Sequence, residues 1–140
     1  MKLFIDTNVV IDVIAEREPF FNDSQKVLAL CESEKAEGVI STLTLCTVAY
    51  VLRKNVSTQM MRKKLREFRN ILRPIDLSAS ILDKAIDSEL ADFEDAVQFF
   101  SAVYSDADYI ITRNVKHFPK DGDLPALTPA AFLALKSKKK

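Results

Sequence analysis

The sequence predicts an α/β fold in which helices cover both faces of a central parallel sheet. Short apolar runs typical of buried strands occur at residues 2–5, 39–41, 74–76 and 109–112. Longer stretches with helical periodicity lie between them, at residues 23–36, 44–54, 58–72, 78–90 and 93–105. Strands that alternate with helices favour a parallel sheet, because parallel neighbours need a long crossover connection.

The first strand is predicted from the opening segment "MKLFIDTNVVIDVI", in which an apolar run ends abruptly at Asp6. After Thr7 and Asn8, apolar residues return with the spacing of one helix face. A strand therefore turns directly into a helix here. This places Asp6 at the carboxyl end of the first strand.

The helix predicted at residues 58–72 separates apolar from basic side chains. Its apolar stripe comprises Met61, Leu65, Phe68 and Leu72, and the basic residues are Arg62, Lys63, Lys64, Arg66, Arg69 and Arg73. Two interpretations remain open for the basic residues. They are either the solvated face of an amphipathic helix or one wall of a groove for a nucleic acid.

The end of the chain is predicted as a loop, a last helix and a tail. Residues 119–125 are rich in proline, glycine and aspartate, which favours a surface loop. Thr128 and Pro129 then have the residue types of an N-cap and a first helical position. We expect one domain over residues 1–135 and a disordered basic tail over residues 136–140.

Composition bounds the functions that this chain can have. With 140 residues, 48% of them hydrophobic, it can bury one sizeable core. No apolar run is long enough to span a membrane and no signal peptide is recognisable, so we expect a cytoplasmic protein. Two glycines exclude glycine-rich phosphate-binding loops, and Cys31 and Cys46 are expected to be buried reduced thiols. Twenty basic and twenty acidic residues balance, so net charge gives no support to a nucleic-acid partner.

Acidic residues recur where a ligand site of an α/β sheet is expected. Asp6 ends the first strand, and Asp92 and Asp95 begin the helix that precedes the strand at residues 109–112. If the first and fourth strands are neighbours, Asp6 and Asp95 converge at one sheet edge. Gathered carboxylates suit Mg²⁺ or Mn²⁺. The alternative is that Asp6 and Asp92 only cap helices.

Four segments together resemble the PIN-domain nucleases, particularly the small bacterial proteins related to VapC toxins. They are "FIDTNVVIDVI", "ISTLTLCTVAYVLRK", "DFEDAVQFFSAVYSDADYIITRNVKHF" and "LTPAAFLAL", and they cover nearly the whole chain. The resemblance implies a three-layer α/β/α fold with a central parallel sheet of about five strands. It also implies a homodimer, cleavage of RNA that depends on Mg²⁺ or Mn²⁺, and an antitoxin that inserts a peptide into the active site.

The resemblance assigns roles to residues of this sequence. Asp6 is implied as a metal ligand, with Asp95 as the acid of the later helix and Asn8 holding Asp6 in place. Thr112 and Asn114 belong to the polar cluster at the fourth strand's end. Arg113 next to them either approaches substrate phosphate or is simply exposed.

Two departures from the family pattern reduce the expected set of acids. Thr47 stands where the family commonly has a glutamate, and Asn114 where an aspartate is common. Asp92 is therefore our prediction for a third metal ligand and catalytic acid beside Asp6 and Asp95. Because affinity for hard cations follows the charge of the ligands, we expect one metal to bind well and a second only with substrate phosphate.

Three alternatives to a nuclease follow from the same residues. The first is a degenerate PIN module that binds RNA or a protein without catalysis, which Thr47 and Asn114 favour. The others are a dehalogenase-like phosphotransferase and a phospho-acceptor domain. Asn8 argues against the former, because the second acid of its strand-end motif is missing. His117, in turn, is either a general acid or base, or a structural or solvent-exposed side chain.

Overall fold

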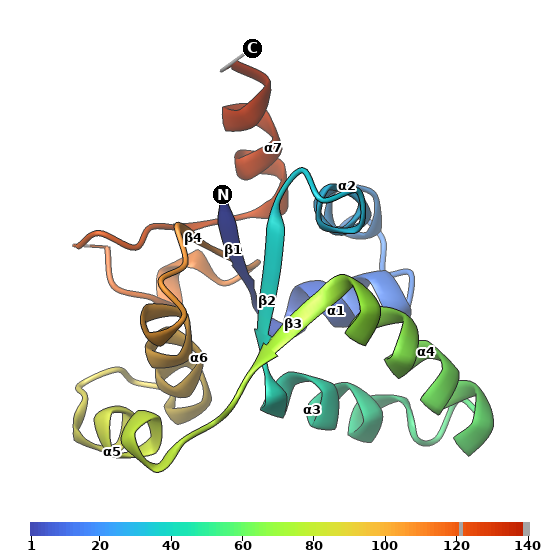
Figure 1. Ribbon diagram of the computed structural model, residues 1–140, viewed down its shortest axis with the longest axis horizontal. Helices are drawn as coiled ribbons and strands as arrows, with labels where there is room; N and C mark the ends of the chain where they lie inside the picture. The colour runs from blue at the N-terminus through green and yellow to red at the C-terminus, as the bar shows by residue number, and fades with distance from the viewer. Residues whose placement is uncertain (121, 139–140) are drawn as a thin grey trace.

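The computed structural model describes residues 1–120 and 122–138, which form three layers around one parallel sheet (Figure 1). The sheet contains β1 (Lys2–Ile5), β2 (Glu37–Ser41), β3 (Leu72–Ile75), β4 (Tyr109–Ile111) and β5 (Ala126–Leu127). Their order is β3-β2-β1-β4-β5, and every neighbouring pair is parallel. The predicted fold class is confirmed.

Helices cover both faces of the sheet. One face carries α1 (Thr7–Ile14), α2 (Phe21–Glu32), α3 (Thr42–Leu52), α4 (Thr58–Ile71) and α7 (Pro129–Lys138), and the other carries α5 (Ala79–Asp87) and α6 (Phe93–Tyr104). Alternate residues of β1 point to opposite faces, as the strand period requires: Leu3 and Ile5 pack with the first set of helices, and Phe4 packs with α6.

The strand order reverses between β1 and β4, which positions the candidate site. Ile5 pairs with Ile111, and the backbone N–H of Asp6 donates to the Ile111 carbonyl oxygen at 2.9 Å. Asp6 and Thr112 therefore leave neighbouring strands at the same edge of the sheet. Such a switch point is where open α/β sheets bind their ligands. The expectation that the first and fourth strands are neighbours is confirmed.

Short polar side chains set where the helices begin. Asp6, Ser41, Ser57, Ser78, Asp92 and Thr128 each accept a hydrogen bond from a backbone N–H at the start of the following helix. Such caps satisfy donors that the first helical turn would otherwise leave unpaired. The predicted cap at Thr128, whose Oγ1 accepts from the Ala131 N–H at 3.1 Å, is confirmed.

One strand is displaced from its predicted position, and two short elements were not predicted. β3 begins at Leu72, because α4 passes directly into a strand instead of ending in a turn. Pro74 is tolerated there because β3 is an edge strand, whose outer side needs no N–H donor. The two-residue strand β5 and the short 3₁₀ helix at Val115–His117 were not located from the sequence.

The C-terminal expectation also needs correction. Helix α7 continues through Lys138, three residues beyond the expected domain end at residue 135. Alanine, leucine and lysine are strong helix formers, which explains why the basic residues extend the helix. Residues 139 and 140, the last part of the predicted tail, lie outside the described residues.

The two cysteines differ in their burial. Cys31 is buried, and burial raises the pKa of its thiol to about 11. Cys46 is exposed, so its predicted burial was wrong; it lies on the face of α3 opposite to Thr44 and Val48. None of the helices built from the described residues has the length and apolar character needed to span a bilayer.

Candidate active site at the edge of strands β1 and β4

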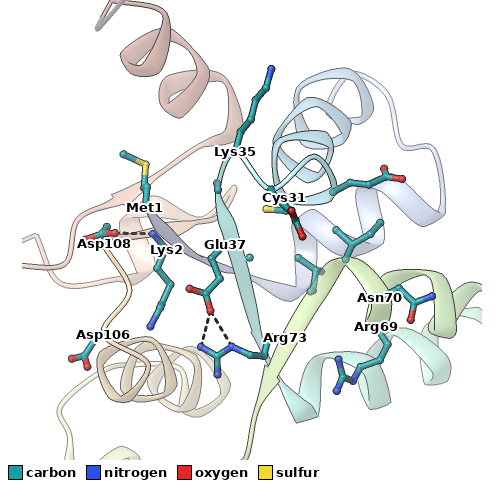
Figure 2. Close-up of a pocket in the computed structure, with 16 residues that line it drawn as sticks. Met1, Lys2, Cys31, Lys35, Glu37, Arg69, Asn70, Arg73, Asp106 and Asp108 are labelled. Atoms are coloured by element: carbon teal, nitrogen blue, oxygen red, sulfur yellow. Dashed lines mark hydrogen bonds and ion pairs between the residues drawn. The ribbon is translucent and has the colours of Figure 1, made fainter.

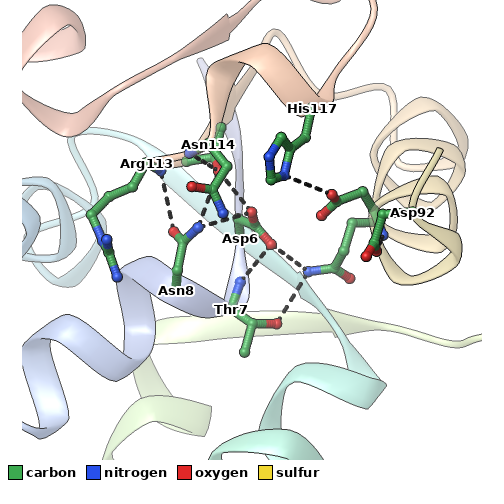
Figure 3. A network of polar contacts seen from close by, with 10 residues as sticks. Asp6, Thr7, Asn8, Asp92, Arg113, Asn114 and His117 are labelled. Carbon is green, nitrogen blue, oxygen red and sulfur yellow. Dashed lines mark hydrogen bonds and ion pairs between the residues drawn. The ribbon is translucent and has the colours of Figure 1, made fainter. Parts of the chain in front are cut away.

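Asp6 is the centre of a polar network at the carboxyl ends of β1 and β4 (Figure 3). Its side chain is 5% exposed, and both oxygens accept hydrogen bonds. Oδ2 accepts from Thr112 Oγ1 at 2.7 Å and Asn8 Nδ2 at 3.4 Å, while Oδ1 accepts from the Thr7 N–H at 2.8 Å. The predicted grouping of Asp6, Asn8 and Thr112 is thus observed, and Asp6 also caps α1.

Gln98 on α6 holds the other side of the Asp6 carboxylate and was missed by the sequence analysis. Its Nε2 donates to Asp6 Oδ1 at 3.0 Å, and it lies 3.3 Å from Thr7 Oγ1 and 3.4 Å from Thr44 Oγ1. Those two threonine hydroxyls are 3.0 Å apart and join α1 to α3. Gln98 is 1% exposed, so three helices fix the orientation of one carboxylate.

A weak sequence signal could have identified Gln98. Among the buried residues of α6, Ala96, Val97, Ser101 and Ala102 are small or apolar, and Gln98 is a large amide in the same stretch. It lies one helical turn after Asp95, on a neighbouring part of the helix surface. A buried amide in an apolar helix needs polar partners, and the strand-end acid Asp6 is a polar residue expected on the same side of the sheet edge.

The other acids stand in the first turn of α6. Asp92 is the N-cap, and its Oδ1 accepts from the Asp95 N–H at 2.9 Å. The Asp95 side chain is 15% exposed, and its Oδ2 lies 3.0 Å from Nδ1 of His117. Glu94, between them, was not singled out from the sequence. The start of α6 thus gathers three carboxylates, those of Asp92, Glu94 and Asp95.

Electrostatics shows that these carboxylates repel one another. Burial raises the pKa of Asp95, and the negative charges of Asp92 and Asp6 raise it further, while His117 lowers it. Burial also raises the pKa of Glu94, again with contributions from Asp6 and Asp92. Both carboxyls therefore lie within electrostatic reach of Asp6. The cluster has too little positive charge to balance it.

Arg113 does not supply that charge. Its backbone N–H donates to Asn8 Oδ1 at 3.2 Å, but its side chain extends past Asn8 toward α1 (Figure 3). There its Nε lies 2.6 Å from Oδ2 of Asp12, a residue with a fully buried side chain. Because this guanidinium is bound to a different, buried acid, His117 at Asp95 is the basic side chain that contacts the cluster among the described residues.

The two positions that depart from the family pattern have different surroundings. Asn114 follows Thr112 and is anchored by its backbone N–H, which donates to Thr112 Oγ1 at 3.0 Å. Thr47 lies on α3 one turn after Thr44 and is partly buried; its hydroxyl makes no hydrogen bond to a described residue. Neither side chain adds a negative charge.

These residues fit a divalent cation that is held partly by other ligands. Within residues 1–120 and 122–138, no three acid, histidine or cysteine side chains are grouped closely enough to enclose a metal ion. Mg²⁺ is, however, commonly held by one or two carboxylates, several waters and substrate phosphates. Hard oxygen donors with uncompensated negative charge, at a sheet edge, match that mode of binding.

A larger hollow lies at the opposite end of the strands and lacks this chemistry. It has a volume of about 880 Å³ and is lined by the amino ends of β1, β2 and β3, with Lys2, Glu37 and Arg73 among its residues (Figure 2). Acidic and basic side chains are mixed along its lining, and Arg73 Nη2 lies 3.0 Å from Glu37 Oε1. We therefore place the candidate active site at Asp6.

Comparisons with known proteins agree with the fold. A family model described as "PIN domain" matches residues 2–116. A curated relative, ribonuclease VapC1 of Aquifex aeolicus, is 26% identical over 136 residues, which cover 94% of this chain and 92% of the relative.

Solved structures share the fold at low sequence identity. A toxin–antitoxin complex from Klebsiella pneumoniae contains a chain that is 22% identical, with a TM-score of 0.68 and coverage of 91% of this chain and 97% of that one. VapBC2 from Rickettsia felis, crystallised with a promoter DNA fragment, is 19% identical, with a TM-score of 0.66 and coverage of 91% and 98%. VapC20 of Mycobacterium tuberculosis, a toxin that cleaves the sarcin-ricin loop, is 13% identical, with a TM-score of 0.60 and coverage of 77% and 86%.

Proposed function

The chain belongs to the PIN-domain family, and on that basis we propose that it is a divalent-metal-dependent endoribonuclease of the VapC toxin type. One observation carries the proposal. At the β1/β4 switch point, Asp6 lies within electrostatic reach of Asp95 on α6, and Arg113 is bound elsewhere. Such an arrangement repels RNA phosphate unless a cation stands between them.

Asp6 and Asp95 are the proposed metal ligands, and Asp92 is a proposed third acid. Mg²⁺ or Mn²⁺ is the proposed ion, because all these donors are carboxylate oxygens. A bound ion of this kind activates water and stabilises the negative charge that develops on phosphate. Among the described residues, no positively charged side chain contacts Asp6, so none there could stabilise the charge on phosphate in place of an ion.

The remaining residues of the network hold these acids in position. Thr112, Asn8 and Gln98 donate to Asp6 from three elements, so its carboxylate keeps one orientation while substrate enters. His117 contacts Asp95 in the same way from the turn after β4. We propose positioning roles for Thr112, Asn8, Gln98 and His117. Asn114, whose backbone N–H donates to Thr112, has the same proposed role.

A binding module without catalysis is the second candidate function. Thr47 favours it, because a neutral hydroxyl replaces the glutamate common in the family, and so does the absence of a closed three-ligand group in the described residues. Such a module would keep the fold and the negative cluster and would bind a cation or a partner without cutting RNA.

Two protein partners are proposed with the nuclease. The Klebsiella pneumoniae and Rickettsia felis relatives were solved as toxin–antitoxin complexes, which supports a neutralising antitoxin for this chain. A homodimer is also proposed. Large apolar side chains exposed on α3 and α6, Tyr50, Phe93 and Tyr104, offer surface for such contacts. Light scattering of the purified protein would measure its oligomeric state.

Incubation with a mixed pool of cellular RNA tests the proposed function. We expect discrete new ends in Mn²⁺, and none in EDTA or with the double variant Asp6→Asn, Asp95→Asn. Asp83→Asn on α5, an exposed acid outside the cluster, is the matched control and should cut like the wild type. If the wild type leaves the RNA intact in Mn²⁺ but melts at a higher temperature with the metal, the binding module is favoured.

A further inference from the structure

A small cavity lies beside the acid cluster, at the same edge of the sheet. It has a volume of about 250 Å³ and is lined by residues from the start of α2, the end of β4 and the start of α7: Pro19, Phe20, Asp23, Ser24, Arg113, Thr128, Pro129 and Ala130. Arg113 follows Thr112 in the chain, and Thr112 donates to Asp6. The cavity is therefore a direct neighbour of the candidate active site.

Arg113 and Phe20 form a flat, rigid wall of this cavity. The guanidinium carbon lies 4.2 Å from the centre of the Phe20 ring, a cation–π contact. Arg113 Nε is fixed by the buried carboxylate of Asp12 at 2.6 Å, and its backbone by Asn8. Such a pair is held in place before any ligand arrives. Phe20 is 40% exposed, so the apolar wall is accessible.

The polar groups of the cavity are not all satisfied by the protein. Both Nη groups of Arg113 lack hydrogen-bond partners within the described residues, although its Nε is bound to Asp12. Ser24 also borders the cavity, but its hydroxyl oxygen is enclosed by the protein and is not presented to a ligand. Asp23 adds an acceptor.

We propose that this cavity is the subsite for one unpaired nucleotide of the RNA strand, with its base against the Phe20–Arg113 pair; the identification of RNA rests on the proposed function. Unstacked bases are recognised by stacking on aromatic rings or guanidinium planes and by hydrogen bonds to their edges. The cavity is smaller than the ~300–1,000 Å³ typical of sites for drug-sized ligands, which suits a single base. The Nη groups of Arg113, which have no partner among the described residues, can donate to the edge of a base or to a phosphate oxygen.

The subsite would place the strand relative to the acids. Arg113 and Asp6 are connected through one residue, because Asn8 accepts from the Arg113 N–H at 3.2 Å and donates to Asp6 at 3.4 Å. A base bound at Arg113 therefore fixes which phosphate lies over the carboxylates. In this way the cavity selects the cleavage position by the nucleotide next to it.

RNA binding without cleavage tests the subsite separately from the nuclease. The background is Asp6→Asn, Asp95→Asn in EDTA, and the probe is a fluorescently labelled single-stranded RNA of fixed sequence. We expect Phe20→Ala to weaken binding by roughly tenfold, the usual range for one stacked base. Ala130→Trp, which fills the cavity from an exposed position, should weaken it similarly. Ile86→Ala, a change at an exposed apolar side chain on α5, is the matched control and should bind within about twofold.

Removal of single bases from the RNA then identifies the contact. We expect one position at which an abasic nucleotide weakens binding as much as Phe20→Ala, with no further loss when both changes are combined. Additive effects at every position, or wild-type affinity for Phe20→Ala and Ala130→Trp, would overturn the proposal and leave a protein segment as the occupant. Base-specific binding by a protein that never cuts RNA would refute the nuclease and retain the subsite.

Discussion

At the scale of single residues, one carboxylate is held by four donors from three parts of the chain. Asp6 accepts from Thr7 and Asn8 on α1, Thr112 after β4 and Gln98 on α6. In proteins that bind metals, partners of this kind orient the ligand and their loss commonly costs 10–100-fold in affinity. The network is therefore as important to the proposed site as the acid itself.

Gln98→Leu should weaken the site without removing an acid. The variant leaves Asp6 Oδ1 with one donor fewer in a buried place, so we expect Mn²⁺ binding to weaken at least tenfold. The free energy of unfolding should also fall by about 1–3 kcal/mol. Titration of Mn²⁺ followed by electron paramagnetic resonance measures the first effect. Gln59→Leu on the exposed face of α4 is the control, and equal affinities for both variants would refute the positioning role.

Thr47→Glu should strengthen the site. It introduces the acid that the PIN family commonly has on this helix, one turn after Thr44, whose hydroxyl already contacts the network. Because ligand charge raises affinity for hard cations, half-maximal cleavage should need several-fold less Mn²⁺. Thr58→Glu at the start of α4 controls for net charge. A cleavage rate with unchanged or weaker dependence on Mn²⁺ would show that position 47 does not reach the ion.

The raised pKa of Asp95 predicts that the stability of the protein depends on pH. Its pKa is raised in the folded protein by burial and by the charges of Asp92 and Asp6, so the folded state binds the proton more tightly than the unfolded chain. Its contribution is therefore most favourable below the unfolded pKa of about 3.9 and is lost as the pH rises through the folded pKa. In EDTA, Asp95→Asn should melt above the wild type at pH 7.

The difference in melting temperature should shrink toward pH 3.5, where the wild-type carboxyl is protonated. Thermal unfolding at both pH values measures it, with Asp83→Asn as the control. Greater stability of the wild type over the variant at pH 7 in EDTA would contradict the repulsion that we infer.

Single residues could be predicted where the chain itself signals them. Asp6 ends an apolar strand, and Asp92 and Asp95 begin a helix, so their residue types and positions predict them as site residues. The contacts of Gln98 with Thr7 and Thr44 exist only because three helices pack together, and no local sequence pattern predicts such contacts. The direction of the Arg113 side chain could not be predicted either. It depends on the packing of α1 beside β4, which places the buried carboxylate of Asp12 within reach of the guanidinium.

At the scale of elements, strands and helices with strong periodicity were predicted and short ones were not. β1 and α6 were located to within a residue, since apolar patterning and caps agree. β5 has two residues and needs β4 beside it, so its sequence carries almost no strand signal. β3 begins two residues before its predicted start, because Leu72 has the spacing of the apolar stripe of α4 but packs as part of the sheet.

Gly38→Ala should destabilise the packing of α2 on the sheet. A Cβ atom at this position in β2 would lie 2.5 Å from Leu72 Cδ2 and 2.8 Å from Cys31 Sγ, closer than real contacts allow. We expect a loss of about 1–3 kcal/mol in the free energy of unfolding, measured with urea. Adding Leu72→Val should recover part of it by removing the clashing atom. Wild-type stability of the single variant would show that β2 and β3 can separate without cost.

At the scale of the whole molecule, the fold explains where the acids meet. All five strands run the same way, so their carboxyl ends share one edge, and the order reverses between β1 and β4. The family pattern allowed this arrangement to be predicted before the structure. The mixed charges of the opposite hollow and the cavity at Phe20 could not be predicted, because both depend on surfaces from distant segments.

The chemical nature of the RNA ends tests the central claim most directly. Metal-dependent hydrolysis uses water as the nucleophile, whereas metal-independent cleavage of RNA uses its own 2′-hydroxyl and leaves a 2′,3′-cyclic phosphate. RNA cut by the wild type in Mn²⁺ should carry new ends without cyclic phosphate, and Asp6→Asn should produce none of them. Cyclic phosphate at the new ends, or the same ends from Asp6→Asn, would contradict a metal-dependent site at Asp6.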